Sequence, residues 1–185
     1  MGLRTIVDLR RGDEVAARPN VLAGASWLRY RNVPMLAEAP GPAPLTLLYR
    51  HIVDAERDRV CEVVALLAAP DALPAAVHCT IGKGRTGVIA ALLLSIADVS
   101  RATIADDYAA TARYIAGEFT TGYRARIEAA GGEWSAYRSM LECPPAFIID
   151  TLAHIDERYG GVVPYLLDGG VARSSIESLR RALVE

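Results

Sequence analysis

A ten-residue segment, His78–Gly87 (HCTIGKGRTG), constrains the fold more than any other part of the chain. The short apolar run Ala75–His78 leads into it and predicts a buried strand, and the apolar run from about Arg85 to Ala97 predicts a helix. A strand that passes through a glycine-rich turn into a helix is typical of α/β proteins. Such a turn binds anions, because the first N–H groups of a helix lack partners within it. Gly82 and Gly84 allow backbone angles that other residues resist.

Two more strands and an irregular loop are expected in the first third of the chain. The apolar, β-branched run Arg4–Leu9 and the alternating run Trp27–Val33 each predict a strand. Four prolines between residues 34 and 44 predict a loop, and Asp54 is expected to cap a helix that ends near Ala69.

Helices are expected to fill the second half of the chain. Helical periodicity occurs near residues 101–115, 122–130, 145–159 and 174–184, and glycine or proline pairs separate these segments. The sequence therefore predicts one α/β domain, residues 1–185, with a central, mostly parallel sheet flanked by helices and a helical C-terminal half.

Composition narrows the classes of function. The net charge of −2 and the isoelectric point near 5.9 argue against a general nucleic-acid binder. No apolar run is long enough to cross a membrane, and the N-terminus lacks the pattern of a signal peptide. Three cysteines do not make a disulfide framework, so we expect a cytoplasmic protein. No cofactor or metal site is indicated, and the oligomeric state cannot be predicted.

The side chains of the ten-residue segment predict phosphate chemistry. Cys79 is expected to have a lowered pKa and to attack phosphorus, because a helix N-terminus and nearby cations stabilise its thiolate. Arg85 can hold two phosphate oxygens, and the Thr86 hydroxyl can steady the thiolate when it leaves. The residues expected to bind phosphate are Thr80, Ile81, Gly82, Lys83, Gly84 and Arg85.

Lys83 is the only lysine of the chain, which has 19 arginines. Its position inside the segment suggests that a compact ammonium is needed there rather than a broad guanidinium. We expect it near the phosphate or near a second anionic group of the substrate.

The segment resembles the signature loop of the protein tyrosine phosphatase superfamily, and its GKGRTG string resembles that of the tensin-type lipid phosphatases. The wider chain resembles a bacterial branch whose members act on phosphotyrosine, phosphoserine or phosphoinositides. Arg4–Arg10, Asp107–Thr111 and Tyr159–Leu179 carry this wider resemblance. It implies the cysteine-phosphatase fold, metal-independent hydrolysis, and a phosphorylated protein or phosphoinositide as substrate.

Two departures from that branch stand out. Many members have an aspartate where this chain has Gly84. Members also have a segment before the first strand, whereas this chain begins directly at it, so we expect a shortened form or a misassigned start.

A phosphatase of this type needs an acid that protonates the leaving oxygen. Glu38, in the proline-rich loop, is the candidate by its place in the sequence. Asp54 is an alternative that a helix cap explains better, and Asp71 precedes the strand at the end opposite Cys79. The third alternative is that no acid exists, in which case good leaving groups would be favoured.

Other polar residues favour structural roles. We expect Asp8 to be a buried, hydrogen-bonded carboxylate, and Asp107 and Tyr108 to pack beneath the cysteine turn. Cys61 and Cys143 are expected to be structural, with a disulfide to an oxidised Cys79 as a less favoured alternative. Two competing functions stay open at this point: a catalytically weak phosphate-binding module, and sulfur transfer through a persulfide on Cys79.

Overall fold

The computed structural model describes residues 2–38 and 44–184. Its sheet has three parallel strands in the order β2-β1-β3. They are β1 (Thr5–Asp8), β2 (Arg29–Asn32) and β3 (Ala75–His78), so each predicted strand is confirmed. Asp8 lies opposite both Asn32 and His78, and all three strands therefore end at one edge of the sheet. Strand β3 is only partly buried, less than its apolar sequence predicts.

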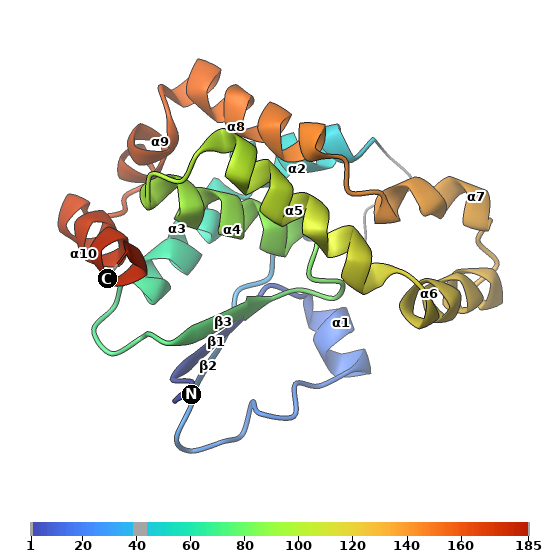
Figure 1. Ribbon diagram of the computed structural model, residues 1–185. Helices are drawn as coiled ribbons and strands as arrows, with labels where there is room; N and C mark the ends of the chain where they lie inside the picture. Colours follow the sequence, from blue (N-terminus) through green and yellow to red (C-terminus); the bar gives the residue numbers. More distant parts are fainter. Residues whose placement is uncertain (1, 39–43, 185) are drawn as a thin grey trace.

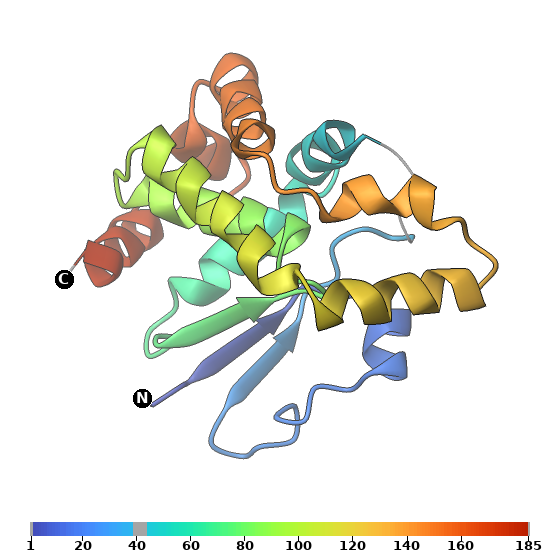
Figure 2. The ribbon, with the colours of Figure 1, turned by 45° about the vertical axis from the view of Figure 1, so that its right-hand side comes forward.

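Most of the helices gather on one side of this small sheet (Figures 1 and 2). Together with the parallel sheet, they confirm the predicted α/β class and the helical C-terminal half. The helices are α1 (Gly12–Ala17), α2 (Leu45–Asp54), α3 (Arg57–Leu67), α4 (Gly84–Ile96), α5 (Arg101–Ile115), α6 (Glu118–Ala129), α7 (Trp134–Tyr137), the 3-10 helix η1 (Arg138–Leu141), α8 (Pro145–Tyr159), α9 (Val162–Asp168) and α10 (Arg173–Val184).

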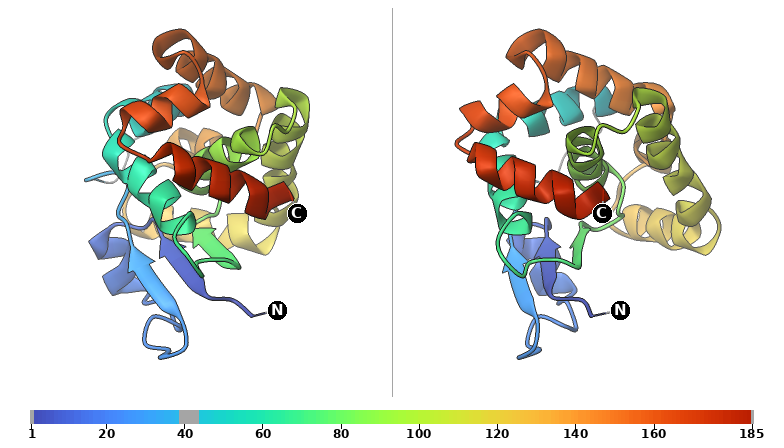
Figure 3. Two further views of the ribbon diagram at one scale, coloured as in Figure 1. Left: turned by 90° about the vertical axis from the view of Figure 1, so that its left-hand side faces the viewer. Right: turned by 60° about the vertical axis from the view of Figure 1, so that its left-hand side comes forward.

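Helix α4, which starts at the glycine-rich turn, is the centre of the helical layer. It contacts α2, α3, α5, α8, α9 and α10. Its residues are apolar on all sides, and a helix of that kind is stable only when neighbours surround it. Helix α10 packs on α3 and α4 at the end of this layer away from α6 and α7 (Figures 1 and 3). The N-terminus of α4 is therefore held firmly by the core.

The prediction that Asp54 begins a helix is wrong. Asp54 is instead the last residue of α2. This helix was not predicted, because proline-rich sequence precedes it. Its carboxylate accepts hydrogen bonds from the Tyr159 hydroxyl at 2.7 Å and from His154 Nε2 at 3.0 Å. Asp54 thus ties α2 to α8. The predicted proline loop includes residues 39–43, which lie outside the described residues.

The shortest helices, α1, α7, α9 and η1, were not predicted either. Each has four to seven residues, too few to display a helical period. Within the described part of the chain, no helix is both long and apolar enough to cross a membrane.

Candidate active site

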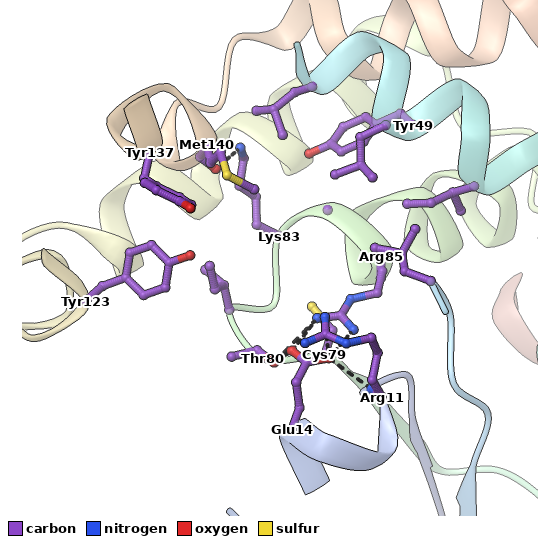
Figure 4. Close-up of a pocket in the computed structure, with 16 residues that line it drawn as sticks. Arg11, Glu14, Tyr49, Cys79, Thr80, Lys83, Arg85, Tyr123, Tyr137 and Met140 are labelled. Atoms are coloured by element: carbon purple, nitrogen blue, oxygen red, sulfur yellow. Dashed lines mark hydrogen bonds and ion pairs between the residues drawn. The ribbon is translucent and has the colours of Figure 1, made fainter. Parts of the chain in front are cut away.

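A pocket of about 290 Å³ lies above the turn between β3 and α4, which we call the cysteine loop (residues 79–83). Side chains from α1, α2, α6, α7 and η1 complete its walls (Figure 4). The lining residues are Arg11, Glu14, Leu36, Leu45, Leu48, Tyr49, Ile52, Cys79, Thr80, Ile81, Lys83, Gly84, Arg85, Tyr123, Tyr137 and Met140. The pocket thus brings together segments that are far apart in the sequence.

Cys79 lies at the base of this pocket and is 8% exposed. Burial by itself would raise the pKa of its thiol. The Arg85 guanidinium, the Thr86 hydroxyl, and the backbone N–H groups of Thr86 and Ile81 outweigh that effect and lower the pKa below its ordinary value. The sulfur is therefore more readily ionised than that of a free cysteine, as the sequence predicts for a nucleophile.

The geometry of the cysteine loop explains its glycine at position 82. Gly82 has a φ of +77°, a conformation that residues with a side chain rarely adopt. This turn lets the N–H groups that follow Cys79 converge on the sulfur. The Thr86 hydroxyl is buried without a hydrogen-bond partner among the described residues, and it is one of the groups that lower the pKa of the Cys79 thiol.

Arg85 forms a two-pronged ion pair with Glu14 of α1. Its Nη1 donates to Glu14 Oε2 at 2.7 Å, and its Nη2 donates to Oε1 at 2.8 Å. Glu14 also accepts hydrogen bonds from the Thr80 hydroxyl and from the Arg11 backbone N–H. Burial opposes ionisation of Glu14, yet these partners hold its pKa at about 2. The carboxylate is therefore a fixed negative charge beside the cysteine loop.

This ion pair leaves one edge of the Arg85 guanidinium free to face the sulfur. Glu14 occupies the end formed by Nη1 and Nη2, and the Leu9 carbonyl accepts a second bond from Nη1 at 3.2 Å. The Nε–H has no oxygen partner among the described residues, and the second Nη2 bond, to Thr80, is stretched at 3.4 Å. The Nε–Nη2 edge can therefore hold two oxygens of an oxyanion above Cys79.

Glu14 was not singled out from the sequence. The available signal was weak: an acidic residue in the first turn after the carboxyl end of β1, three residues beyond Arg11, where its side chain accepts the Arg11 N–H. That pattern indicates a helix start, but it does not reveal a partner 71 residues away.

Two tyrosines support the start of α4. A Cβ atom at Gly84 would lie 3.2 Å from Tyr49 Cε1, and a Cβ at Gly87 would lie 2.9 Å from Tyr108 Cδ2. The two hydroxyls bond to each other at 2.7 Å in the core. The predicted packing of Tyr108 beneath the cysteine turn is confirmed, whereas Asp107 is exposed, so its predicted supporting role is wrong. Asp107 turns outward because it is next to Tyr108 on a helix.

A second polar network holds the base of the loop. His78 Nδ1 lies 3.1 Å from the Cys79 carbonyl oxygen, and its Nε2 lies 3.0 Å from Asn20 Nδ2. Asp8 lies 3.6 Å from the same ring, is fully buried, and accepts bonds from Arg10 and from the Tyr30 hydroxyl. Asp8 is thus the buried, hydrogen-bonded carboxylate that the sequence predicts.

The predicted proton donor, Glu38, lies outside the pocket, and the predicted second cation, Lys83, lines it but is engaged with a backbone carbonyl. Glu38 is exposed and does not line the pocket. Lys83 lines the pocket, but its ammonium donates to the Met140 carbonyl at 2.6 Å. Asp71 forms an ion pair with Arg4 at 2.6 Å, near the opposite end of the strands. Among the lining residues of the described chain, Glu14 is the only carboxylate.

The groups gathered at the base of the pocket suit the binding of an oxyanion. Residues 2–38 and 44–184 contain no group of three or more His, Cys, Asp or Glu side chains placed to hold a metal ion. At the base of the pocket, the N–H groups of Ile81 and Thr86 and one edge of the Arg85 guanidinium converge on the Cys79 sulfur.

Comparison with known proteins identifies the family. The model of the tyrosine phosphatase family matches residues 1–185. The chain belongs to the tyrosine phosphatase family. The resemblance that the cysteine segment indicates is thereby confirmed.

Two characterised relatives place this tyrosine phosphatase family member in a bacterial branch. It is 28% identical over 199 residues to the tyrosine-protein phosphatase of Nostoc commune, and the match covers 97% of this chain and 66% of the relative. It is 30% identical over 141 residues to the triple specificity protein phosphatase PtpB of Mycobacterium tuberculosis, covering 66% of this chain and 47% of the relative. The chain therefore spans just under two thirds of the first relative and just under half of the second.

Proposed function

We propose that residues 1–185 form a single phosphatase domain that hydrolyses phosphomonoesters through a phosphocysteine intermediate on Cys79. The observation that carries the proposal is the convergence of the Ile81 and Thr86 N–H groups and the Arg85 guanidinium on a sulfur of lowered pKa at the base of a pocket. Family membership and the names of both relatives support phosphotyrosine in proteins as the first substrate to test. Phosphoserine, phosphothreonine and phosphoinositides are the further candidates.

The first step is an in-line displacement. The Cys79 thiolate attacks phosphorus, an S–P bond forms, and the P–O bond to the leaving group breaks with its electron pair on oxygen. The Nε–Nη2 edge of Arg85 holds two of the phosphoryl oxygens. Loop N–H groups from Thr80 to Gly84 stabilise the charge that builds up on these oxygens. Glu14 keeps the guanidinium in this orientation by occupying its other end.

The second step regenerates the enzyme. Water attacks the phosphocysteine, the S–P bond breaks, and inorganic phosphate leaves. The Thr86 hydroxyl stabilises the returning thiolate, in agreement with its buried position beside the sulfur. No cofactor takes part in either step.

Glu38 stays the proposed proton donor to the leaving oxygen, although it is exposed outside the pocket. The Glu14 carboxyl cannot serve, because a pKa of about 2 leaves it without a proton near neutral pH. If Glu38 is the donor, Glu38→Gln slows the hydrolysis of alkyl phosphates by more than tenfold. The hydrolysis rate of aryl phosphates with very acidic leaving groups stays nearly unchanged. An equal effect on both would reject Glu38.

Replacement of the nucleophile tests the proposed function. We expect Cys79→Ser to abolish turnover of p-nitrophenyl phosphate and of a phosphotyrosine peptide while inorganic phosphate still binds. Cys61→Ser is the matched control, because Cys61 is an equally buried cysteine of the core outside the pocket. Turnover of Cys79→Ser at the parent rate would end the proposal. A parent protein that binds phosphate but hydrolyses no ester would also end the proposal, because that is the behaviour of a phosphate-binding module.

We also propose a cytoplasmic location. All three cysteines are free, which supports this proposal.

A further inference from the structure

Lys83 belongs to the cysteine loop, yet its ammonium does not turn toward the sulfur. It is directed away from Cys79 and toward Met140 (Figure 4), and Nζ donates to the Met140 carbonyl at 2.6 Å. The side chain is only 2% exposed. Among the described residues it forms no ion pair with a carboxylate, and Glu142 acts on the ammonium only from a longer distance. Its one hydrogen-bond partner is therefore a backbone oxygen of η1.

Burying the Lys83 ammonium costs free energy, which other interactions must offset. Burial lowers the pKa of Lys83 to about 8, which shows that the protein environment disfavours the ammonium. An ordinary surface lysine would avoid this penalty by reaching solvent. The bond to the Met140 carbonyl is strengthened by the charge of its donor. An unbranched side chain with a compact ammonium needs less room in a buried position than arginine does, and this chain otherwise has arginine at every strongly basic position.

The segment that Lys83 holds forms one wall of the pocket. Tyr137 ends α7, Met140 lies in η1, and both line the pocket together with Tyr123 of α6 and Ile81 of the loop. The opposite wall consists of Leu36 and of four α2 residues, Leu45, Leu48, Tyr49 and Ile52. An aromatic ring attached to a phosphate bound at Cys79 would therefore lie between apolar surfaces.

The described lining of the pocket lacks a cation that could bind a second phosphate group. Arg11, the other cation of its lining, pairs with Asp13 at 2.8 Å and with Glu14 at 3.3 Å. Lys83 is engaged with Met140, and Arg85 has one edge left, which the first phosphate needs. Among the described lining residues, no cation is free for a further phosphate.

We infer that Lys83 is a positioning residue that fixes the Tyr137–Met140 wall, and that the pocket disfavours a polyphosphorylated inositol headgroup because its described lining has no free cation for a second phosphate. This inference rests on the proposed function, because it names the substrate class of the same site. It differs from the role in phosphate binding that the sequence suggests for Lys83.

Binding of two inhibitors separates the two roles of Lys83 without any need for turnover. Phenylphosphonate occupies the anion site and the wall, whereas inorganic phosphate occupies the anion site alone. We expect Lys83→Met to weaken phenylphosphonate at least fivefold in calorimetry and to change phosphate affinity by less than twofold. A loss of phosphate affinity equal to or larger than the loss of phenylphosphonate affinity would overturn the inference.

Two further variants keep the test decisive if Lys83→Met does not fold. Tyr137→Ala alters the same wall without touching the cysteine loop, and it should reproduce the selective loss of phenylphosphonate. Arg59→Met is the control, because it removes an exposed cation outside the pocket and should change neither affinity. Unchanged phenylphosphonate binding in Tyr137→Ala would show that the wall has no role in binding and would overturn the inference.

The inositol part of the inference is tested on the parent protein. We expect inositol 1,4,5-trisphosphate to bind at least tenfold more weakly than phenylphosphonate, and equal or tighter binding would refute the preference. Failure of the proposed function gives a different result, because a parent protein without hydrolytic activity would still report all of these affinities.

Discussion

Replacing Glu14 by glutamine tests the link between α1 and the cysteine loop. The change preserves the shape of the side chain and removes the charge that pairs with Arg85. Glu14 is mostly buried, with 15% of its side chain exposed, and its pKa of about 2 lies well below the ordinary 4.5. A difference of roughly 2.5 pKa units corresponds to about 3 kcal/mol in favour of the ionised, folded form. We therefore expect Glu14→Gln to lower the free energy of unfolding at pH 7 by about 2–3 kcal/mol.

The same pKa predicts how this difference changes with pH. Because the pKa of Glu14 is lowered by folding, its stabilisation is complete above about pH 4.5 and is lost as pH falls toward 2. Urea unfolding should show that the gap between the parent and Glu14→Gln shrinks to less than half of its neutral value by about pH 3. A gap that stayed constant over this range would contradict the assignment of the stabilisation to the ion pair.

The kinetic effect of Glu14→Gln should fall on the chemical step. Without the carboxylate, the end of the guanidinium that Glu14 holds is released, and a displacement of about 1 Å costs on the order of 100-fold in rate. We expect kcat for p-nitrophenyl phosphate to fall by about 10- to 100-fold, with a smaller change in KM. Asp13→Asn is the matched control, since Asp13 is a neighbouring, exposed acid that pairs with Arg11 alone. If Asp13→Asn reproduced the loss, or if Glu14→Gln kept the parent kcat, the positioning role of Glu14 would be refuted.

Two further predictions concern the cysteine loop and its support. Gly84→Ala places a Cβ against the Tyr49 ring, so it should lower the free energy of unfolding in urea by about 1–3 kcal/mol. The loss should be smaller when Tyr49 is replaced by leucine. An equal loss with Tyr49 and with leucine at position 49 would exclude the contact. Iodoacetate should modify Cys79 first at pH 6–7, because its thiol pKa is lowered while burial raises the pKa of the Cys61 and Cys143 thiols. Inorganic phosphate should protect Cys79, and peptide mapping that found Cys61 or Cys143 modified first would contradict the lowered pKa.

The departure of this chain at position 84 has a structural explanation. Many members of the branch that the sequence resembles have an aspartate there, whereas here the Tyr49 ring lies 3.2 Å from where a side chain would begin. In this chain, a side chain at position 84 would therefore require the Tyr49 ring to shift by a few tenths of an ångström. Nothing in the local sequence around Gly84 indicates this, because Tyr49 belongs to a different helix.

The long helices and the strands could be predicted because their signals are local. The run Ala75–His78 and the apolar stretch that became α4 each show their nature within a few residues. Helix α2 and the short α1 could not be predicted in the same way. Helix α2 was missed because proline-rich sequence precedes it, although its buried residues Leu45, Tyr49, Ile52 and Val53 follow a helical period. Helix α1 has only six residues, too few to display such a period.

The sequence by itself determined which groups form the proposed anion site, because Cys79, Gly82, Gly84 and Arg85 lie within seven consecutive residues whose spacing sets their geometry. Only the tertiary structure decided what the charged groups of that turn contact. Arg85 meets Glu14 across 71 residues, and Lys83 meets the Met140 carbonyl across 57. The physical reason is that a hydrogen bond requires its partners within about 3 Å. The folding of the intervening chain sets the distance between two such partners. A local pattern of residues therefore cannot predict it.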